Sequence, residues 1–145
     1  MVPILRYFIQ IQIRHLCMTL LYNLNINSMN NYWLKDPEQH DFAAAVDYLE
    51  LLFSPEEAKA LVNNLQNAIT IKKKAKDILR ASRLSLLPKN DIDVKNAIKK
   101  FNKGKKLSPV LLVKYGHKLI IADGYHRICA AYYLSEDLEI SCRLV

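Results

Sequence analysis

Cysteine is scarce in this chain of 145 residues, and its few copies follow no metal-binding pattern. Cys17, Cys129 and Cys142 have no metal-ligand spacing, and joining any two would leave one thiol unpaired. This favours a reducing compartment, and we expect a cytoplasmic protein. Cys129 and Cys142 fall in a predicted helix and a predicted strand, where small buried apolar side chains are expected. A nucleophilic role for Cys129, two residues after Arg127, stays open.

Long apolar runs are also missing. A membrane-spanning helix needs about 20 predominantly apolar residues, and no window of this chain provides them. The apolar N-terminal tract is broken by charged and amide side chains, and no secretory cleavage site follows it. Within it, Ile9, Ile11 and Ile13 alternate with glutamines as in a strand. We expect residues 1–28 to be poorly anchored, with a translation start at Met29 as the alternative.

Glycine is rare as well, with three copies, and there is no Gly/Ser-rich linker, internal repeat or low-complexity tract. The hydrophobic content of 51% excludes a disordered chain. At this length a single core is the default. We therefore predict one α+β domain over residues 29–145, with its core at about 69–145. It consists of a small mixed β-sheet with packed helices, preceded by an N-terminal helical hairpin.

Positive charge is abundant but unevenly distributed. The net charge is +7, yet residues 68–118 hold thirteen Lys and two Arg against three Asp, whereas the remainder holds six basic and eleven acidic residues. Such a block indicates a polyanionic partner, either a nucleotide or nucleic acid, although a solvated basic face is the common explanation of Lys-rich helices.

The helical hairpin is predicted from two capping patterns. Asp36-Pro37-Glu38 offers an N-cap, a proline at the first helical position and an acid in the first turn, so a helix is expected from Asp36 to about Phe53. Ser54-Pro55-Glu56-Glu57 forms a capping box that starts a second helix.

The rest of the chain mixes strands and helices. Asp91 is expected to cap a helix that ends at Gly104, and Asp77 to cap a shorter one that ends at Ser82. Strands are expected from Ile69 through the following basic residues toward Lys76, at Val110–Val113, from Leu119 to the Asp123-Gly124 pair, and from Ile140 to Leu144.

The most informative stretch lies where the strand from Leu119 ends at Asp123-Gly124 and a helix begins. The first backbone N–H groups of a helix have no intrahelical partner and attract anions. His126 and Arg127 would add donors there, and Gly124 permits a tight turn or a close approach. We interpret this turn as a phosphate-binding cradle. An ordinary strand-to-helix turn with a solvated Arg127 is the alternative.

The run from Ser108-Pro109-Val110 through Gly124-Tyr125-His126-Arg127 to Ile140–Val145 resembles the core of the ParB/sulfiredoxin superfamily. Its members have a strand that ends in a Gly-x-His/Arg-Arg turn, a helix with small residues and a closing strand. The resemblance covers about residues 69–145 and implies a nucleotide or another phosphate compound at the turn. It also brings a preceding strand and turn beside this site, so it implies Arg80, Ser82 and Arg83 as further ligand candidates. By spacing alone these three are ordinary loop residues.

Tyr125 departs from that family pattern. Sulfiredoxins have their reactive cysteine at this place, and ParB proteins and their nucleotide-hydrolysing relatives tend to have a glutamate. The residues of the motif that would bind phosphate are present, but the residue that would carry out the chemistry is missing. Sulfiredoxin reductase activity is therefore not expected. Tyr125 itself could stack on the ligand or cover it.

Three functions therefore stay open. The first is a phosphate- or nucleotide-binding domain that uses the turn from Gly124 to Arg127. The second is an enzyme on the same scaffold, a nucleotide phosphohydrolase or small-molecule kinase, with Mg²⁺ as a further cofactor and Asp123 as the catalytic candidate. Asp123 could instead cap the helix, orient His126 or bind a divalent cation. The third is a nucleic-acid-binding module that uses residues 68–118. The oligomeric state is not predicted.

Overall fold

The computed structural model describes residues 9–20 and 32–145. The chain divides into two units, residues 1–31 and residues 32–145. In the first unit, residues 9–20 are helical, so the strand-like alternation of Ile9, Ile11 and Ile13 is misleading. Leu, Met, Gln and Arg favour helices, and an isolated strand lacks a pairing partner. The predictions on the remainder of residues 1–28 and on Met29 lie outside the described residues.

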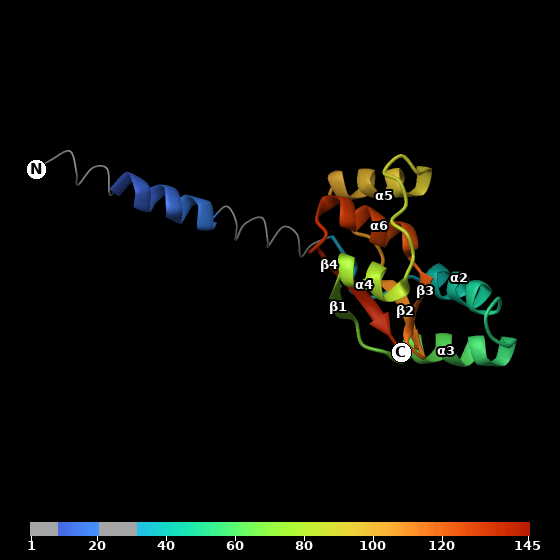
Figure 1. Ribbon diagram of the computed structural model, residues 1–145. Coiled ribbons are helices and arrows are strands. Elements are labelled where there is room, and N and C mark those ends of the chain that lie inside the picture. Colours follow the sequence, from blue (N-terminus) through green and yellow to red (C-terminus); the bar gives the residue numbers. More distant parts are fainter. Residues whose placement is uncertain (1–8, 21–31) are drawn as a thin grey trace, which may run out of the picture. The chain divides into compact units, whose positions relative to one another are not determined.

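The second unit is an α+β domain with a four-stranded mixed sheet and helices packed on it, as predicted. The helical hairpin comes first, and four strands and three helices follow it (Figure 1). In chain order the elements are α2 (Gln39–Leu49), α3 (Pro55–Asn67), β1 (Ile71–Lys74), α4 (Ala75–Ser82), α5 (Ile92–Asn102), β2 (Val110–Tyr115), β3 (Lys118–Asp123), α6 (Tyr125–Leu134) and β4 (Glu139–Leu144).

The strands lie in the order β1-β4-β2-β3. β2 and β3 form an antiparallel hairpin, β4 runs parallel to β2, and β1 pairs antiparallel with β4. β1 begins at Ile71, opposite Cys142, and continues through three lysines to Lys74. The strand predicted from Ile69 toward Lys76 is therefore present over its central part, and Ile69 before it is 79% exposed.

Two helices begin elsewhere than predicted, because their expected caps are engaged by other groups. α2 begins at Gln39 with Glu38 as its N-cap, since Asp36 instead accepts a hydrogen bond from Arg143 at 2.7 Å. α4 begins at Ala75 with Lys74 as its N-cap, and Asp77 pairs with an arginine of the same helix. α2 also ends at Leu49, four residues earlier than expected, in a short turn that leads to α3.

The other predicted caps are confirmed. Ser54 accepts a hydrogen bond from the Glu57 N–H at 3.2 Å, while the Glu57 carboxylate accepts one from the Ser54 N–H at 3.0 Å. Asp91 accepts hydrogen bonds from the N–H groups of Asp93 and Val94 at the start of α5. These signals are local, which is why the sequence alone predicts them correctly.

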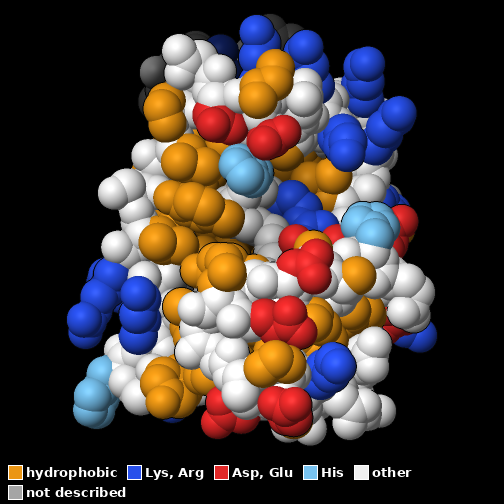
Figure 2. Space-filling model, turned by 90° about the vertical axis from the view of Figure 1, so that its right-hand side faces the viewer, with side chains coloured by type: hydrophobic (Ala, Val, Ile, Leu, Met, Phe, Trp, Pro, Cys, Tyr) orange, Lys and Arg blue, Asp and Glu red, His pale blue; other side chains and the backbone are white. Residues whose placement is uncertain are grey.

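Figure 2 shows charged, hydrophobic and other side chains on one face of the second unit. One face has a hollow, with histidine on both sides of it and Lys and Arg side chains inside it and along its upper right edge (Figure 2). None of the described helices combines the length and the apolarity that crossing a membrane requires.

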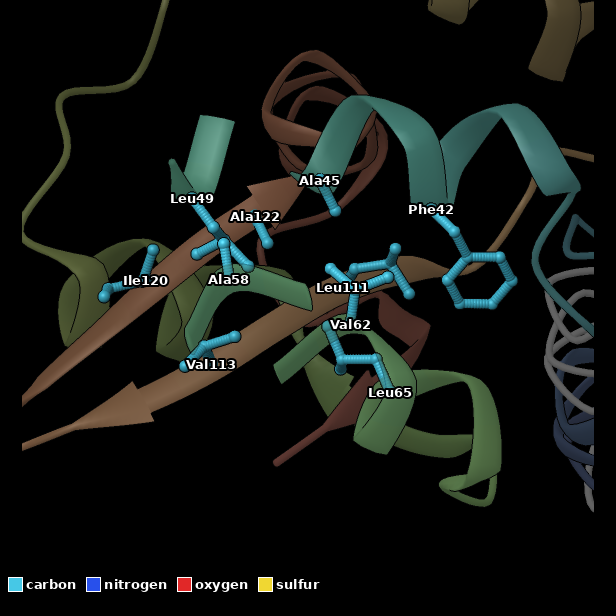
Figure 3. Close-up of a cluster of buried hydrophobic side chains, with 10 residues drawn as sticks. All are labelled: Phe42, Ala45, Leu49, Ala58, Val62, Leu65, Leu111, Val113, Ile120 and Ala122. Carbon is cyan, nitrogen blue, oxygen red and sulfur yellow. The ribbon is translucent and has the colours of Figure 1, made fainter. Parts of the chain in front are cut away.

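The helical hairpin forms part of the core rather than an addition to it. Side chains of α2 and α3, including Leu49 and Leu65, pack against Leu111 and Val113 of β2 and Ala122 of β3 (Figure 3). Leu49, Leu65 and Leu111 are completely buried. Since successive strand residues point to opposite faces, the alternate residues of β2 and β3 face the other side of the sheet. On that side α4 contacts β3, and α6 contacts both β2 and α4. The sheet is thus enclosed between two helical layers.

Candidate functional site

The predicted strand, turn and helix are present at Asp123-Gly124. β3 ends at Asp123, α6 begins at Tyr125, and Gly124 between them is the N-cap with a φ of 103°. A Cβ at this position would lie 2.5 Å from Val110 Cγ1 and 2.9 Å from Arg127 Nη2. Both the positive φ and the close packing require glycine here.

Arg127 lies between two carboxylates. Its Nη1 donates a hydrogen bond to Asp41 Oδ1 at 3.1 Å, and its Nη2 donates one to Asp123. Asp41 belongs to the first turn of α2 and is 2% exposed. Its other oxygen accepts hydrogen bonds from the Ser108 hydroxyl and, at 2.8 Å, from the Glu38 N–H. Arg127 therefore links α6 to α2 and to the end of β3, and it is not a solvated first-turn residue.

The two carboxylates around Arg127 have opposite pKa shifts. Burial by itself raises the pKa of Asp41, but the hydrogen bond from Ser108, the charge of Arg127 and the Glu38 N–H together hold that pKa below its usual range. Burial raises the pKa of Asp123 to about 6; Arg127 opposes this shift, and the nearby Asp41 adds to it. At neutral pH, Asp41 is the firmly ionised partner of Arg127.

Asp123 does not have the roles predicted for it at the turn. The N-cap of α6 is Gly124, and no side chain caps the helix, so the predicted cap is wrong. Asp123 does not orient His126 either, because the imidazole Nε2 faces Asp91 Oδ1 at 4.0 Å and Asp93 Oδ2 at 3.8 Å. The reason is that Arg127, one helical turn further on, takes the Asp123 carboxylate.

His126 and Arg127 share one pocket of about 670 Å³, which is the hollow described above (Figure 2). Ser108 and the first turn of α2 border the pocket at the Arg127 network. α5 and the loop after it supply the rest of its wall. The lining comprises Glu38, His40, Asp93, Asn96, Ala97, Lys99, Lys100, Lys103, Lys105, Lys106, Leu107, Ser108, His126 and Arg127.

Tyr125 lies outside this lining. Its hydroxyl donates a hydrogen bond to the backbone oxygen of Ser85, and Tyr133 of the same helix similarly donates to the backbone oxygen of Leu87 at 2.7 Å. Burial raises the pKa of Tyr125. The two tyrosines therefore anchor the loop between α4 and α5 onto α6, and Tyr125 does not face the pocket.

The further ligand candidates Arg80, Ser82 and Arg83 are not brought to the same pocket. Arg80 pairs with Asp77 at 3.1 Å, and Arg80 and Arg83 line a separate hollow of about 380 Å³. Ser82 is completely buried and donates a hydrogen bond to the backbone oxygen of Leu79. The end of α4 turns away at Arg83, which has a φ of 57°.

The basic residues of 68–118 are divided among several surfaces. Lys76 lines the hollow of Arg80 and Arg83, whereas Lys114 and Lys118 line another beside the β2–β3 turn. Lys74 and Lys76 each pair with Asp137, at 3.4 Å and 2.6 Å. The lysines of α5 and its following loop are the ones that meet His126 and Arg127.

Both cysteines of the second unit are inaccessible. Cys129 and Cys142 are free thiols with no exposed surface, as expected for small buried apolar side chains. Burial raises the pKa of Cys129 and raises that of Cys142 to about 11. Neither thiol has the exposure or the lowered pKa of a nucleophile.

Two groups of side chains at the pocket could hold a cation: Glu38, His40 and Asp41 form one, and Asp91, Asp93 and His126 form the other. Each includes an imidazole, whereas Mg²⁺ prefers oxygen ligands in a near-ideal octahedron. Asp41 is already taken by Arg127 and Ser108, and Asp91 by backbone N–H groups. Asp123, for which cation binding was one of three open roles, belongs to neither group. These residues do not fit the predicted Mg²⁺.

Most of the side chains that surround the turn could not be assigned to the site from the sequence. Asp41 is 86 residues from Arg127, and its only local signal is its place as the acid of the α2 capping box. Ser108 lies just before the predicted strand at Val110 and has no local signal. The α5 lysines are part of the predicted basic block, but only the packing of α5 on α6 brings them to His126.

Comparison with known proteins gives no relative: no family model, no curated protein and no solved structure matches this chain.

Proposed function

We propose that residues 32–145 form a domain that binds a phosphate compound, such as a nucleotide, in the pocket at the start of α6. One observation carries the proposal: His126 and Arg127, adjacent in sequence at a helix N-terminus, line the same pocket as five lysines. A helix N-terminus attracts anions, and imidazole, guanidinium and ammonium groups all donate hydrogen bonds to phosphate oxygens.

In this proposal His126 and Arg127 have different tasks. The His126 side chain is 45% exposed and lines the pocket. Arg127 is 16% exposed and is engaged by two carboxylates. A guanidinium has five N–H donors, so the remaining ones can meet a ligand oxygen while Asp41 fixes the side chain in place. We therefore assign the ligand contact mainly to His126 and the lysines.

The relation to the ParB/sulfiredoxin superfamily belongs to the same proposal. The order of β3, the Gly-Tyr-His-Arg turn, α6 and the closing strand β4 supports it. A cytoplasmic location is part of the proposal too, and the unpaired thiols of Cys17, Cys129 and Cys142 support it.

Phosphoryl transfer or nucleotide hydrolysis is the second candidate, and one observation favours it. Asp123 has a pKa near 6, so its carboxyl group could exchange a proton close to neutral pH. Asp123 lies behind Arg127 and does not line the pocket. An attacking oxygen would thus have to reach it past the guanidinium, and we rank binding above catalysis. Release of inorganic phosphate from ATP by the wild type, lost in Asp123→Asn, would reverse this order.

Isothermal titration calorimetry tests the proposed function with inorganic phosphate, AMP and ATP as ligands. The matched variants are His126→Ala and His117→Ala; His117 is an exposed histidine in the β2–β3 turn, away from the pocket. We expect at least one of the three compounds to bind the wild type and His117→Ala equally. We expect about tenfold weaker binding by His126→Ala, the loss of one charge-assisted hydrogen bond. Absence of binding by all three compounds, or equal binding by the two variants, would contradict the proposal.

A further inference from the structure

The two edges of the sheet differ in how they are protected against pairing with another chain. β1 carries three successive lysines at residues 72–74, and lysines on an edge strand discourage such pairing. β3, at the opposite edge, has a lysine only at its start, and its next four residues, 119–122, are apolar. A register shift against β2 confines the regular part of β3 to residues 118–121. This stretch of edge has little charge to keep another strand away.

The hydrogen bonds of β2 show which backbone groups of β3 face outward. The Lys114 N–H donates to Val145 O at 2.7 Å, and the Val145 N–H donates to Leu112 O at 3.2 Å, so both β2 residues bond toward β4. In an antiparallel pair, two opposite residues either bond to each other or both bond away from the pair. Leu119 lies opposite Lys114 and therefore directs its N–H and C=O groups away from β2. The same holds for Ile121, which lies opposite Leu112.

These outward groups of β3 are unpaired. Within residues 9–20 and 32–145, nothing donates to or accepts from the outward N–H and C=O groups of Leu119 and Ile121. The edge is open at its start, because Leu119 lines a surface hollow of about 300 Å³ with Ala81 of α4. Ile121 retains 6% of its surface, whereas Leu112 opposite it retains 1%. Unpaired backbone groups on an edge strand are a template for a further strand.

Helix α2 provides a second surface beside this edge. Ala45 and Leu49 of α2 pack on β3, on one face of the sheet (Figure 3). The opposite side of the helix carries Ala43 and Ala44, which are both exposed, and Tyr48, which is 41% exposed. Helices pack with their axes about 8–10 Å apart, at the shorter end where the side chains are small. The exposed alanines thus permit another helix to approach α2 closely.

We infer that this edge pairs with the same edge of a second copy, so that the two sheets join into one. A two-fold axis at Ile120 places Leu119 opposite Ile121 of the second copy, and each outward group then has a partner. In this register Lys118 lies opposite Ala122 of the second copy, so no like charges oppose each other, and the other paired side chains are apolar. The axis is perpendicular to the sheet, so the two α2 helices lie on the same face.

Analytical ultracentrifugation of the full chain, together with amide hydrogen exchange followed by NMR, tests the inference. The wild type is measured from about 20 μM to about 1 mM, because a small interface gives a weak dimer. Leu119→Pro removes an outward N–H and leaves the β2–β3 ladder intact. Leu119→Ala is the matched control, since it shortens the same side chain and retains the N–H. Ala44→Glu tests the contact of α2 without touching the strand.

We expect a dimer whose population increases with concentration, and exchange of the Leu119 and Ile121 amides that becomes several-fold slower as it forms. Leu119→Pro should weaken the dimer about tenfold or more, the loss of one hydrogen bond from each copy. Ala44→Glu should weaken it similarly, because it brings a carboxylate into the helix contact, whereas Leu119→Ala should weaken it less than about threefold.

A monomer at all concentrations with fast exchange of both amides would overturn the inference. Slow exchange in a monomer would overturn it as well, since residues 1–31 of the same chain would then cover the edge. A dimer in which both amides exchange fast, or one that Leu119→Pro and Leu119→Ala weaken equally, would show that the copies meet elsewhere. Phosphate binding at the start of α6 is measured separately and does not depend on these outcomes.

Discussion

At the scale of single residues, the site depends on the contacts of Arg127. Two carboxylates hold this side chain, and one of them, Asp41, is buried and has further hydrogen bonds of its own. A buried and fully satisfied network of this kind fixes side-chain positions. The His126 imidazole next to it has only exposed or half-buried acids as neighbours. The network therefore provides the buried frame of the site, and His126 is its exposed member.

Gly124 leaves no room for even one added carbon atom. We predict that Gly124→Ala lowers the free energy of unfolding by about 3 kcal/mol, because the new Cβ would combine backbone strain with a clash against Val110. Gly116→Ala is the matched control, since Gly116 also has a positive φ, of 60°, but nothing lies within 4 Å of its added Cβ. It should lose about 1 kcal/mol. Urea denaturation measures both values, and equal losses would refute the packing argument.

Asp123 should give the stability a distinctive pH dependence. Its pKa rises from 3.8 to about 6 on folding, so its stabilising contribution is complete below pH 3.8 and is lost as the pH rises to about 6. Asp41 has a lowered pKa and acts in the opposite direction. The variant Asp123→Asn removes the pH-dependent contribution of Asp123. We predict that, relative to this variant, the wild type loses about 2 kcal/mol of stability between pH 4 and pH 7.

Urea denaturation at a series of pH values measures that difference. Asp47→Asn, at an exposed position of α2, controls for the loss of a surface carboxylate. A wild type that gains stability relative to Asp123→Asn as the pH rises would show that the sign of the shift is wrong.

At the scale of helices and strands, Arg143 of β4 joins the helical hairpin to the sheet. It is 8% exposed, and its Nη1 donates to the carbonyl oxygens of Leu65 and Gln66 at the end of α3, at 3.2 Å and 2.7 Å. Carbonyl groups at a helix C-terminus lack intrahelical partners. Arg143 donates hydrogen bonds to these carbonyl groups, and its Nη2 also donates to Asp36 at 2.7 Å.

We predict that Arg143→Met lowers the free energy of unfolding by about 3 kcal/mol, because it leaves buried carbonyl groups without donors. Arg80→Met on α4 is the control, since the Arg80 side chain is 84% exposed and pairs only with Asp77. That change should stay within about 0.5 kcal/mol. Chemical denaturation monitored by circular dichroism provides the comparison, and similar values for the two variants would exclude this role of Arg143.

The sequence predicts those elements whose signals are local. Ser54 and Asp91 cap their helices by accepting hydrogen bonds from N–H groups two or three residues further on. Gly124 indicates a turn because its φ is positive. The start of α2 is mispredicted because Asp36 has a partner 107 residues away. The exact ends of β1 are not predicted for a similar reason, since its register depends on β4. The turn at Gly124 can therefore be predicted from the sequence. The contacts that α2 and α5 make with it cannot, because they depend on the packing of distant elements.

At the scale of the whole molecule, the pocket forms where α2, α5 and α6 meet. α2 brings Asp41 to Arg127 from one side of the sheet, α5 packs on α6 from the other, and the loop before β2 adds Ser108. The mixed sheet fixes this arrangement, because β2 and β3 position the turn at Gly124. Phosphate recognition would thus depend on the complete fold of residues 32–145 and not on the Gly-Tyr-His-Arg motif alone.

An NMR titration of the ¹⁵N-labelled chain with tripolyphosphate tests the central claim most directly. We predict that the largest shifts occur in the backbone amides of residues 124–128, at the start of α6, and of residues 99–106, at the end of α5 and in the loop after it. Amides of β1 and of the β2–β3 turn, which are also near lysines, should move little. Shifts centred on residues 72–76 or 114–118, or no shifts at all, would contradict the account.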